Sequence, residues 1–556
     1  MSLATQFLTS IRGFVSRQDG AALRDWLQVD RGASPQYWTL AQELRVGFRD
    51  DAAVSSLVDR CLPTDEDDGS EGGVPWPGLV AFVRDYMLYW RGVDFDDLPA
   101  LHVLLSGLLT SAATALSHPT HGTLMLETGV AVAESLARLV MVLHRRPDLM
   151  RRMRPAGANA AAPAGGSTGD EERKSLMENT ADAIQKLFTT CLIDRSSSRW
   201  SRPEGKKTAV YRLANLVLKL LFAGNKARWA VQMFTNIAST GPPLALYPAA
   251  QRVTYLYYLG RFFLENNNFA RAALCLDDAY RQTPPACLRH RRLILAYLIP
   301  ANMLLGRFPS DALLLRPEAA DLLRPVFAPI VAAVRRGNFV AFHIALRQHE
   351  PWLFRRGLLA TLAYRLRPLL WRSLARNTFI LTYQPPADPD SSNNTRRPAP
   401  TLDLADLLTA ATLAQHQLEG WIPVAPAPRP RPPHTNTLFL RAVANTTAEN
   451  ISRNPPSSTL AAPPGGPRRL RPSEGLVWGN LRVTLADVES IVASLVAQGL
   501  MHGFVAHAAA KFAVVGAKAK GSALLAGWPP VAKVLRDRLA EEGVDLLSVP
   551  AWVKAP

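Results

Sequence analysis

The longest uniform stretch of this chain runs from Ala181 to Arg376 and shows almost no alternation of apolar and polar residues. Apolar residues recur there at spacings of three and four, as in Leu213, Leu216 and Leu220. Those spacings place the apolar side chains on one face of a helix, whereas a strand would need a period of two. The stretch therefore predicts successive amphipathic helices and a mainly α fold.

One part of this stretch has a more specific pattern. Small and aromatic residues fall where a tetratricopeptide-type repeat has its packing residues: Leu259, Gly260, Phe263, Phe269, Ala272, Leu276, Ala279 and Pro284. Small residues permit two helices to approach closely, aromatic rings fill the groove between them, and the proline ends the unit. Because helices continue on both sides, the pattern predicts a right-handed superhelix of TPR-like repeats.

The C-terminal part has a different organisation. Leu402 to Gln417 has helical periodicity, and a second helix begins at Thr484, which is a good N-cap residue. Two short β-like runs follow, Gly503 to His507 and Lys511 to Val515. Two helices followed by a two-stranded wing predict a C-terminal winged helix that caps the superhelix.

Shifts in composition set the expected boundaries of these parts. We expect an N-terminal helical region at 1–154, which contains an acidic loop at 63–73, and then a flexible linker at 155–175. The helical-repeat superhelix follows at 176–383, and a polar loop at 384–401. The winged helix is expected at 402–548, interrupted by a proline-rich disordered insertion at 422–475.

Several classes of protein are disfavoured. The N-terminal helix is interrupted by Arg12 and Arg17, unlike a secretory signal, and the longest uncharged stretch, Leu98 to Leu126, is broken by a loop. We therefore expect a buried core helix there and no membrane insertion. The four cysteines form no CxxC pair, so neither a disulfide framework nor a zinc site is indicated.

No catalytic or cofactor motif is convincing. A literal GxSxG at Gly165 to Gly169 lies in a low-complexity linker and not on a strand-to-helix turn. His349-Glu350 lacks the second histidine of a zinc protease helix, and no HxH pair exists. We expect no enzyme activity, no cofactor and no metal.

The charge pattern is the strongest physical signal of function. The chain carries 63 Lys and Arg against 46 Asp and Glu, a net charge of +17. Between Arg324 and Arg376 there are ten arginines and a single acid, Glu350. Such a stretch would find counter-charge in the phosphates of a nucleic acid. Two alternatives remain open: a solvated face, or acids supplied by the rest of the fold or by an acidic partner.

The second helix of the winged helix, Thr484 to Gln498, contains Asp487 and Glu489 and no Lys or Arg, which argues against base reading in the major groove. Basic residues surround it instead, so contacts to phosphates without sequence specificity are expected. The candidate nucleic-acid residues are Arg335, Arg336, Arg355, Arg356, Arg468, Arg469, Arg471, Arg482, Lys511, Lys518 and Lys520. Val505 and Phe512, which alternate on the strands, are assigned to the core or to a protein interface.

Four blocks of sequence carry a resemblance to a known family: Tyr257 to Tyr280, Arg291 to Ser310, Val334 to Gly357 and Val483 to His507. They resemble the PCI-domain family, over roughly 211–533. The words LIPANMLLG and RRGNF are the most specific, and are most similar to the subfamily with members in the transcription-and-export (TREX-type) complex at nuclear pores and in association with the COP9 signalosome.

This resemblance implies a PCI fold and a non-enzymatic scaffold role in mRNA export, with a location in the nucleus at nuclear pores and some cytoplasmic presence. It also implies three partners: a large GANP-like scaffold subunit, a small acidic disordered subunit shared with the proteasome lid, and RNA or DNA. The alternative is a protein-interaction subunit of a signalosome-like or lid-like assembly that does not itself bind nucleic acid.

Overall fold

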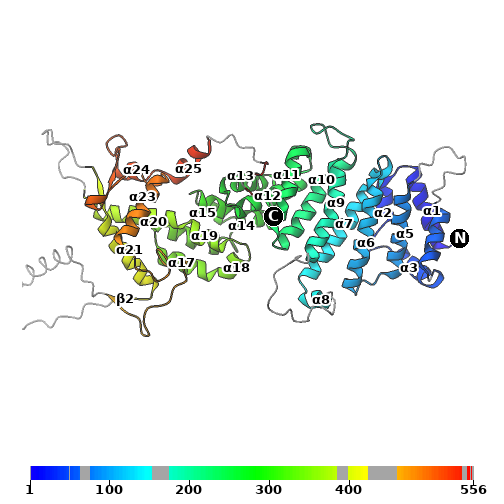
Figure 1. Cartoon of the computed structure of the whole chain (residues 1–556), viewed down its shortest axis with the longest axis horizontal. Coiled ribbons are helices and arrows are strands. Elements are labelled where there is room, and N and C mark those ends of the chain that lie inside the picture. Colours follow the sequence, from blue (N-terminus) through cyan, green and yellow to red (C-terminus); the bar gives the residue numbers. More distant parts are fainter. Residues whose placement is uncertain are drawn as a thin grey trace, which may run out of the picture. The chain divides into compact units, whose positions relative to one another are not determined.

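The computed structural model describes residues 2–48, 50–62, 76–152, 175–384, 399–423, 460–540, 547–550 and 553. It divides into two compact units, Met1–Pro284 with Asp545–Pro556, and Pro285–Val544. Both are mainly helical (Figure 1). The boundary between them falls within 176–383, the stretch expected to be one superhelix. The acidic loop at 63–73 and the linker at 155–175, except Ser175, lie outside the described residues.

Unit 1 is built from helices in its described residues. They are α1 (Leu3–Ser16), α2 (Gly20–Trp26), α3 (Pro35–Gly47), α4 (Asp51–Cys61), α5 (Pro77–Gly92), α6 (Leu98–Ser117), η1 (His121–Met125), α7 (Leu126–His144), α8 (Pro147–Arg152), α9 (Leu176–Leu192), η2 (Gly205–Ala209), α10 (Val210–Ala223), η3 (Ala227–Trp229), α11 (Ala230–Thr240), η4 (Leu244–Leu246), α12 (Ala249–Glu265) and α13 (Phe269–Gln282).

The pair α12 and α13 has the close packing that its small residues predict. A Cβ atom added at Gly260 would lie 2.6 Å from Cγ of Leu276, so only glycine permits this separation of the two helices. Ala272 and Ala279 are fully buried at the same interface. The Asn268 side chain accepts a hydrogen bond from the backbone N–H of Arg271 and caps the start of α13.

Helix α6 is the single described helix that is long and apolar enough to cross a membrane by length and composition. Its apolar side chains Leu105, Leu108 and Leu109 are buried within unit 1, where α6 packs against α5, α7 and α9. This is the buried position that the interrupted apolar stretch predicts.

Unit 2 contains a helical layer followed by the winged helix. Its elements are α14 (Leu288–Leu304), α15 (Asp311–Leu314), α16 (Arg324–Arg336), α17 (Phe339–Gln348), α18 (Glu350–Phe354), α19 (Leu359–Arg365), α20 (Arg367–Thr382), β1 (Thr401–Asp403), α21 (Leu404–Leu418), β2 (Ile422–Pro423), β3 (Leu460–Ala461), α23 (Leu485–Ala497), β4 (Gly503–Ala506), η5 (His507–Ala509), β5 (Lys511–Val514), α24 (Ala523–Gly527) and α25 (Val531–Ala540).

The winged helix has the two predicted helices and the predicted wing. Helices α21 and α23 pack together and against α20 (Figure 1). Thr484 and Asp487 form a reciprocal capping box at the start of α23. Strands β4 and β5 pair antiparallel, and β1, which the sequence pattern did not predict, adds a third strand in the order β1-β5-β4. The fold is therefore mainly α, with helical repeats and a C-terminal winged helix.

The insertion predicted at 422–475 falls partly on described residues. Residues 424–459 lie outside the described part of the chain, as do residues 385–398 of the polar loop. Residues 460–475, however, are described: β3 pairs with β2, and Glu474 is buried. The prolines and glycines of this segment gave it the composition of a disordered region, but its backbone is held by contacts with the helical layer.

Candidate interaction surface

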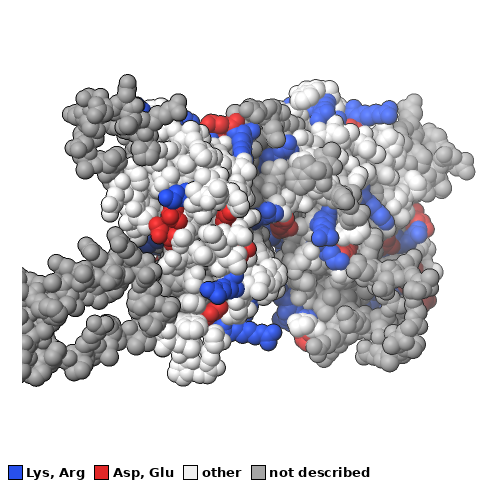
Figure 2. Space-filling model, turned by 60° about the vertical axis from the view of Figure 1, so that its left-hand side comes forward, with Lys and Arg blue, Asp and Glu red and all other residues white. Residues whose placement is uncertain are grey.

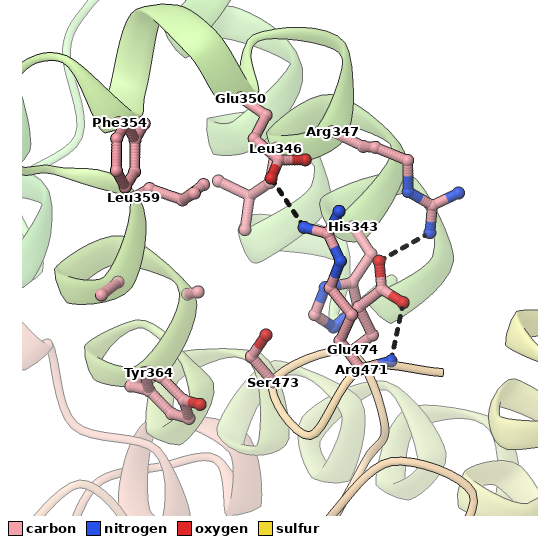
Figure 3. Close-up of a pocket in the computed structure, with 12 residues that line it drawn as sticks. His343, Leu346, Arg347, Glu350, Phe354, Leu359, Tyr364, Arg471, Ser473 and Glu474 are labelled. Atoms are coloured by element: carbon pink, nitrogen blue, oxygen red, sulfur yellow. Dashed lines mark hydrogen bonds and ion pairs between the residues drawn. The ribbon is translucent and has the colours of Figure 1, made fainter. Parts of the chain in front are cut away.

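A pocket in unit 2 is formed by α17, α18, α19 and the segment 471–474 (Figure 3). Its volume is about 220 Å³. Phe354, Leu359 and Tyr364 line one side, and charged side chains line the other. Phe354 is 73% exposed, although it is aromatic. An apolar wall that remains open beside fixed charges is a surface suited to a protein partner.

Glu474 is the centre of the charged side. Its carboxylate pairs with Arg347 at 3.0 Å and with Arg468 at 3.3 Å, and it accepts a hydrogen bond of 3.1 Å from the backbone N–H of Arg471. Burial acts to raise the pKa of Glu474, but this hydrogen bond and the two guanidinium charges outweigh it, and the net pKa is lowered. Glu474 is thus ionised at neutral pH and ties its segment to α17.

His343 lies beneath this cluster and is 4% exposed. Its Nε2 has no hydrogen-bond partner among the described residues. Burial, followed by the charges of nearby arginines, lowers its pKa to about 4. The imidazole is therefore neutral at physiological pH, and it contributes a polar atom to the pocket without adding charge.

Two further arginines attach the C-terminal part of unit 2 to the helical layer. Arg367 donates to the carbonyl oxygens of Leu476 and Val477 at 2.6 and 3.2 Å. Arg372 donates to those of Leu500 and Pro529 at 2.9 and 2.8 Å. Burial lowers the pKa of Arg372 to about 10, still well above neutral, so its charge is retained. These guanidinium groups have a structural role.

The arginines of 324–376 are thus not all uncompensated, as the sequence suggested. Arg347 meets Glu474, and Glu350 pairs with Arg471 at 2.6 Å (Figure 3). Arg468 and Arg471, two of the candidate nucleic-acid residues, are therefore in ion pairs within the fold. Acids that are distant in the sequence supply this compensation, and a one-dimensional charge count does not detect it.

The other candidate basic residues have varied surroundings. The guanidinium of Arg356 stacks on Trp352 at 3.9 Å, and that of Arg335 lies over Phe308 at 5.4 Å. Lys511 is opposite Asp403 in the β1–β5 ladder. Among the described residues, no ion pair joins an acid to the following exposed side chains: Arg336, Arg355, Arg469, Arg482, Lys518 and Lys520.

The candidate residues occupy separate elements. Arg335 and Arg336 end α16, Arg355 and Arg356 follow α18, and Lys518 and Lys520 follow β5. On the face drawn in Figure 2, Lys and Arg are separated by uncharged surface and have acids beside several of them. No continuous basic track is visible on that face.

Of the two alternatives for Val505 and Phe512, core or protein interface, the structure favours the core. Phe512 is fully buried and contacts Trp528, with ring centroids 6.0 Å apart. Val505, its partner in the β4–β5 ladder, is half-buried on the same face of the sheet. Both belong to the winged-helix core, because this face of the sheet covers the helices. The exposed aromatic residue of the wing is Phe504, which is 54% exposed on the opposite face.

Sequence reasoning missed His343, Glu474 and Phe504. Glu474 was placed within a disordered insertion, although a lone acid after three arginines at 468, 469 and 471 is a usable signal of an ion pair. Phe504 follows from strand alternation once Phe512 is fixed as core. His343 has no sequence signal, since its isolation depends on the packing around it.

Comparison with known proteins gives partial matches. No family model matches the chain. It is 32% identical over 223 residues to PCI domain-containing protein 2 of Danio rerio. The aligned residues make up 40% of this chain and 52% of that relative. It is 29% identical over 214 residues to a PCI domain-containing protein of Schizosaccharomyces pombe, and 30% identical over 215 residues to the Neurospora crassa protein CSN12 homolog. The chain spans about half the length of the curated relatives it matches.

Proposed function

We propose that this chain, whose fold and similarities are those of a PCI-domain protein, is a non-enzymatic scaffold subunit of a nuclear-pore-associated mRNA export complex. The observation that carries the scaffold role is that unit 2 leaves large apolar side chains in solvent on three of its elements, where Phe354, Leu381 and Phe504 are 73%, 85% and 54% exposed. Large apolar side chains left in solvent by a folded unit are typical of subunit interfaces.

The wing is the proposed contact for the large GANP-like scaffold subunit. Among the described strands β4 lies at the edge of the sheet, with unpaired backbone groups on its outer side. Phe504 projects from this strand into solvent. An edge strand with an exposed aromatic residue can extend a partner's sheet or pack on its winged helix.

The pocket of Figure 3 is the proposed contact for the small acidic disordered subunit. Its rim carries Arg347 and Arg471, and its wall carries Phe354 and Tyr364. Apolar side chains of an extended acidic segment would pack on this wall, and its carboxylates would compete with Glu474 and Glu350 for the two guanidinium groups.

Nucleic acid is proposed to bind through the basic side chains that the fold leaves in solvent. Lys518, Lys520 and Arg482 lie around the winged helix, whereas α23 has no Lys or Arg. Contacts would therefore be made to phosphates, and binding would tolerate any sequence.

The test is the salt dependence of single-stranded RNA binding by the full chain, measured by fluorescence anisotropy. Reversing the charge of Lys511, Lys518 and Lys520 to Glu, or of Arg335 and Arg336 to Glu, should weaken binding and flatten its salt dependence. Reversal of Arg12 and Arg17, which are exposed in unit 1, is the control. Unchanged binding after both reversals would reject these residue assignments.

A second candidate function is a protein-interaction subunit of a COP9-signalosome-like or proteasome-lid-like assembly, without nucleic-acid binding. The CSN12 name of a relative and the internal pairing of Arg468 and Arg471 favour it. Affinity capture from nuclear extract separates the two: the export role requires recovery of a GANP-like subunit, and recovery of signalosome subunits alone supports the alternative.

A further inference from the structure

Unit 1 contains a surface cavity of its own. Its volume is about 570 Å³. It lies between η2 with the start of α10 on one side and η4 with the start of α12 on the other, and its charged lining residues are Glu127, Arg202, Arg212 and Arg252.

The charge of this cavity is positive and largely fixed in position. Arg212 is held by Glu127 at 3.0 Å and by Glu134 at 2.7 Å. Arg252 is held by neutral acceptors, at 2.9 Å each from Oε1 of Gln282 and the carbonyl oxygen of Tyr247. Arg252 and the exposed Arg202 have no ion pair among the described residues, so three guanidinium groups face a single lining carboxylate.

A helix begins at this cavity: Pro248, which lines the cavity, directly precedes α12. The first turn of a helix has backbone N–H groups without partners and the positive end of the helix dipole. Both features add to the guanidinium charges in favouring an anion.

An exposed tryptophan lies on the segment that leads to Arg202 of this cavity. Trp200, two residues before Arg202, is 74% exposed. Its loop is anchored, because Arg199 donates to the carbonyl oxygens of Gly241 and Ala238 at 3.1 and 2.6 Å. The Arg199 guanidinium also lies over the Trp200 ring at 5.1 Å. The fold therefore holds this indole in solvent, and burial in the core does not account for it.

We propose that Trp200 and the Arg202–Arg212–Arg252 cavity form a contact site for single-stranded nucleic acid in unit 1. One phosphate occupies the arginine cavity and a neighbouring base stacks on the indole. Two residues of chain span at most about 7 Å, so both groups lie within reach of adjacent parts of one strand. A phosphorylated peptide would use the cavity but would leave the exposed indole without a role, which favours the nucleic acid.

This inference deepens the nucleic-acid part of the proposed function but uses different residues, so either can fail alone. The experiment is anisotropy of a labelled 20-nucleotide oligo(U) RNA with the full chain. Trp200→Ala should weaken binding about 5- to 100-fold, the range expected for the loss of one stacked base. Arg202→Glu should weaken it and reduce the salt slope by about one phosphate contact.

The matched control is Trp229→Ala, which removes another exposed tryptophan of unit 1, 49% exposed, from η3, a segment that contributes no residue to the cavity lining. It should leave the affinity within about twofold. The inference is overturned if Trp200→Ala and Arg202→Glu both bind as the unaltered chain does. It is also overturned if a phosphopeptide competes fully for the cavity and binds the Trp200→Ala variant unchanged.

Discussion

The α12–α13 pair of unit 1 and the attachment of the winged helix in unit 2 are held together by different physics. The first is an apolar contact in which Gly260 lets Leu276 approach within van der Waals distance. The second depends on Arg347, Arg367 and Arg372, which reach across to Glu474 and to backbone carbonyl oxygens. The difference shows that a run of arginines in a repeat protein can stabilise contacts within the fold as well as form a binding surface.

The two attachments also differ in what breaks them. An apolar contact fails when its shape changes, whereas a buried charge cluster fails when one partner is removed and the other charges are left without compensation. Substitutions at each attachment can therefore test the comparison.

The largest effect is expected at Glu474. Glu474→Ala should lower the free energy of unfolding of unit 2 by about 2–3 kcal/mol, because it removes the ion pairs with Arg347 and Arg468 and the hydrogen bond from the backbone N–H of Arg471. Chemical denaturation followed by circular dichroism measures this. Glu350→Ala, which removes a more exposed pair with Arg471, should cost less than about 1 kcal/mol. Equal losses for the two variants would contradict the central place of Glu474.

The next effect is expected at Gly260. Gly260→Ala should destabilise unit 1 by about 1–3 kcal/mol, because the new Cβ would lie 2.6 Å from Cγ of Leu276. Gly107→Ala in α6 is the matched change, since a Cβ there meets no atom within 4 Å. That variant should be neutral or up to about 1 kcal/mol more stable. If both variants had the same stability, close packing would not explain Gly260.

His343 supplies a pH-dependent effect. Its folded pKa of about 4 lies below the ordinary histidine value, so the unfolded chain binds a proton that the folded chain does not between about pH 6.5 and 4. Stability should therefore fall as pH falls through this window, by about 2 kcal/mol at pH 5 from this group alone.

His343→Leu should abolish the contribution of this histidine to the fall in unfolding free energy between pH 7.5 and pH 5. Chemical denaturation at the two pH values measures this. His290→Asn, at an exposed position on α14, is the control and should keep the full loss. A pH dependence that is unchanged in His343→Leu would show that the buried imidazole titrates normally.

The smallest effect is expected for an arginine outside the network. Arg336 is exposed and makes no ion pair among the described residues, so Arg336→Ala should change the stability of unit 2 by less than about 0.5 kcal/mol. Thermal unfolding is a sufficient measurement. A loss of stability as large as that of Glu474→Ala would mean that the division of the arginines into structural and merely exposed side chains is wrong.

Apolar patterns allowed much of the fold to be predicted. The periodicity of Leu213, Leu216 and Leu220 indicated helices, and the spacing of Gly260 and Leu276 located a tightly packed pair. Thr484 marked the start of α23. These features depend on neighbours within one or two helical turns, or on one hairpin, and such local relations are visible in a sequence.

The polar contacts could not be predicted in the same way. Arg347 and Glu474 are 127 residues apart, and Arg372 reaches the carbonyl of Pro529 across 157 residues. Hydrogen bonds to backbone carbonyls need no particular partner side chain and leave no pattern in the sequence. Arg471 was assigned to nucleic acid because its carboxylate partner, Glu350, is 121 residues away, whereas Arg468 was so assigned although its partner Glu474 is near in the sequence.

The most direct measurement of the arginine network is amide hydrogen exchange of residues 468–481 in the unaltered chain and in Glu474→Gln. If the arginines and Glu474 hold this segment in place, its amides are protected in the unaltered chain and exchange much faster in the variant. The amides of α12 and α13 keep their protection in both proteins. Exchange of the segment at the rate of an unfolded peptide in the unaltered chain, or equal protection in both proteins, would contradict the account.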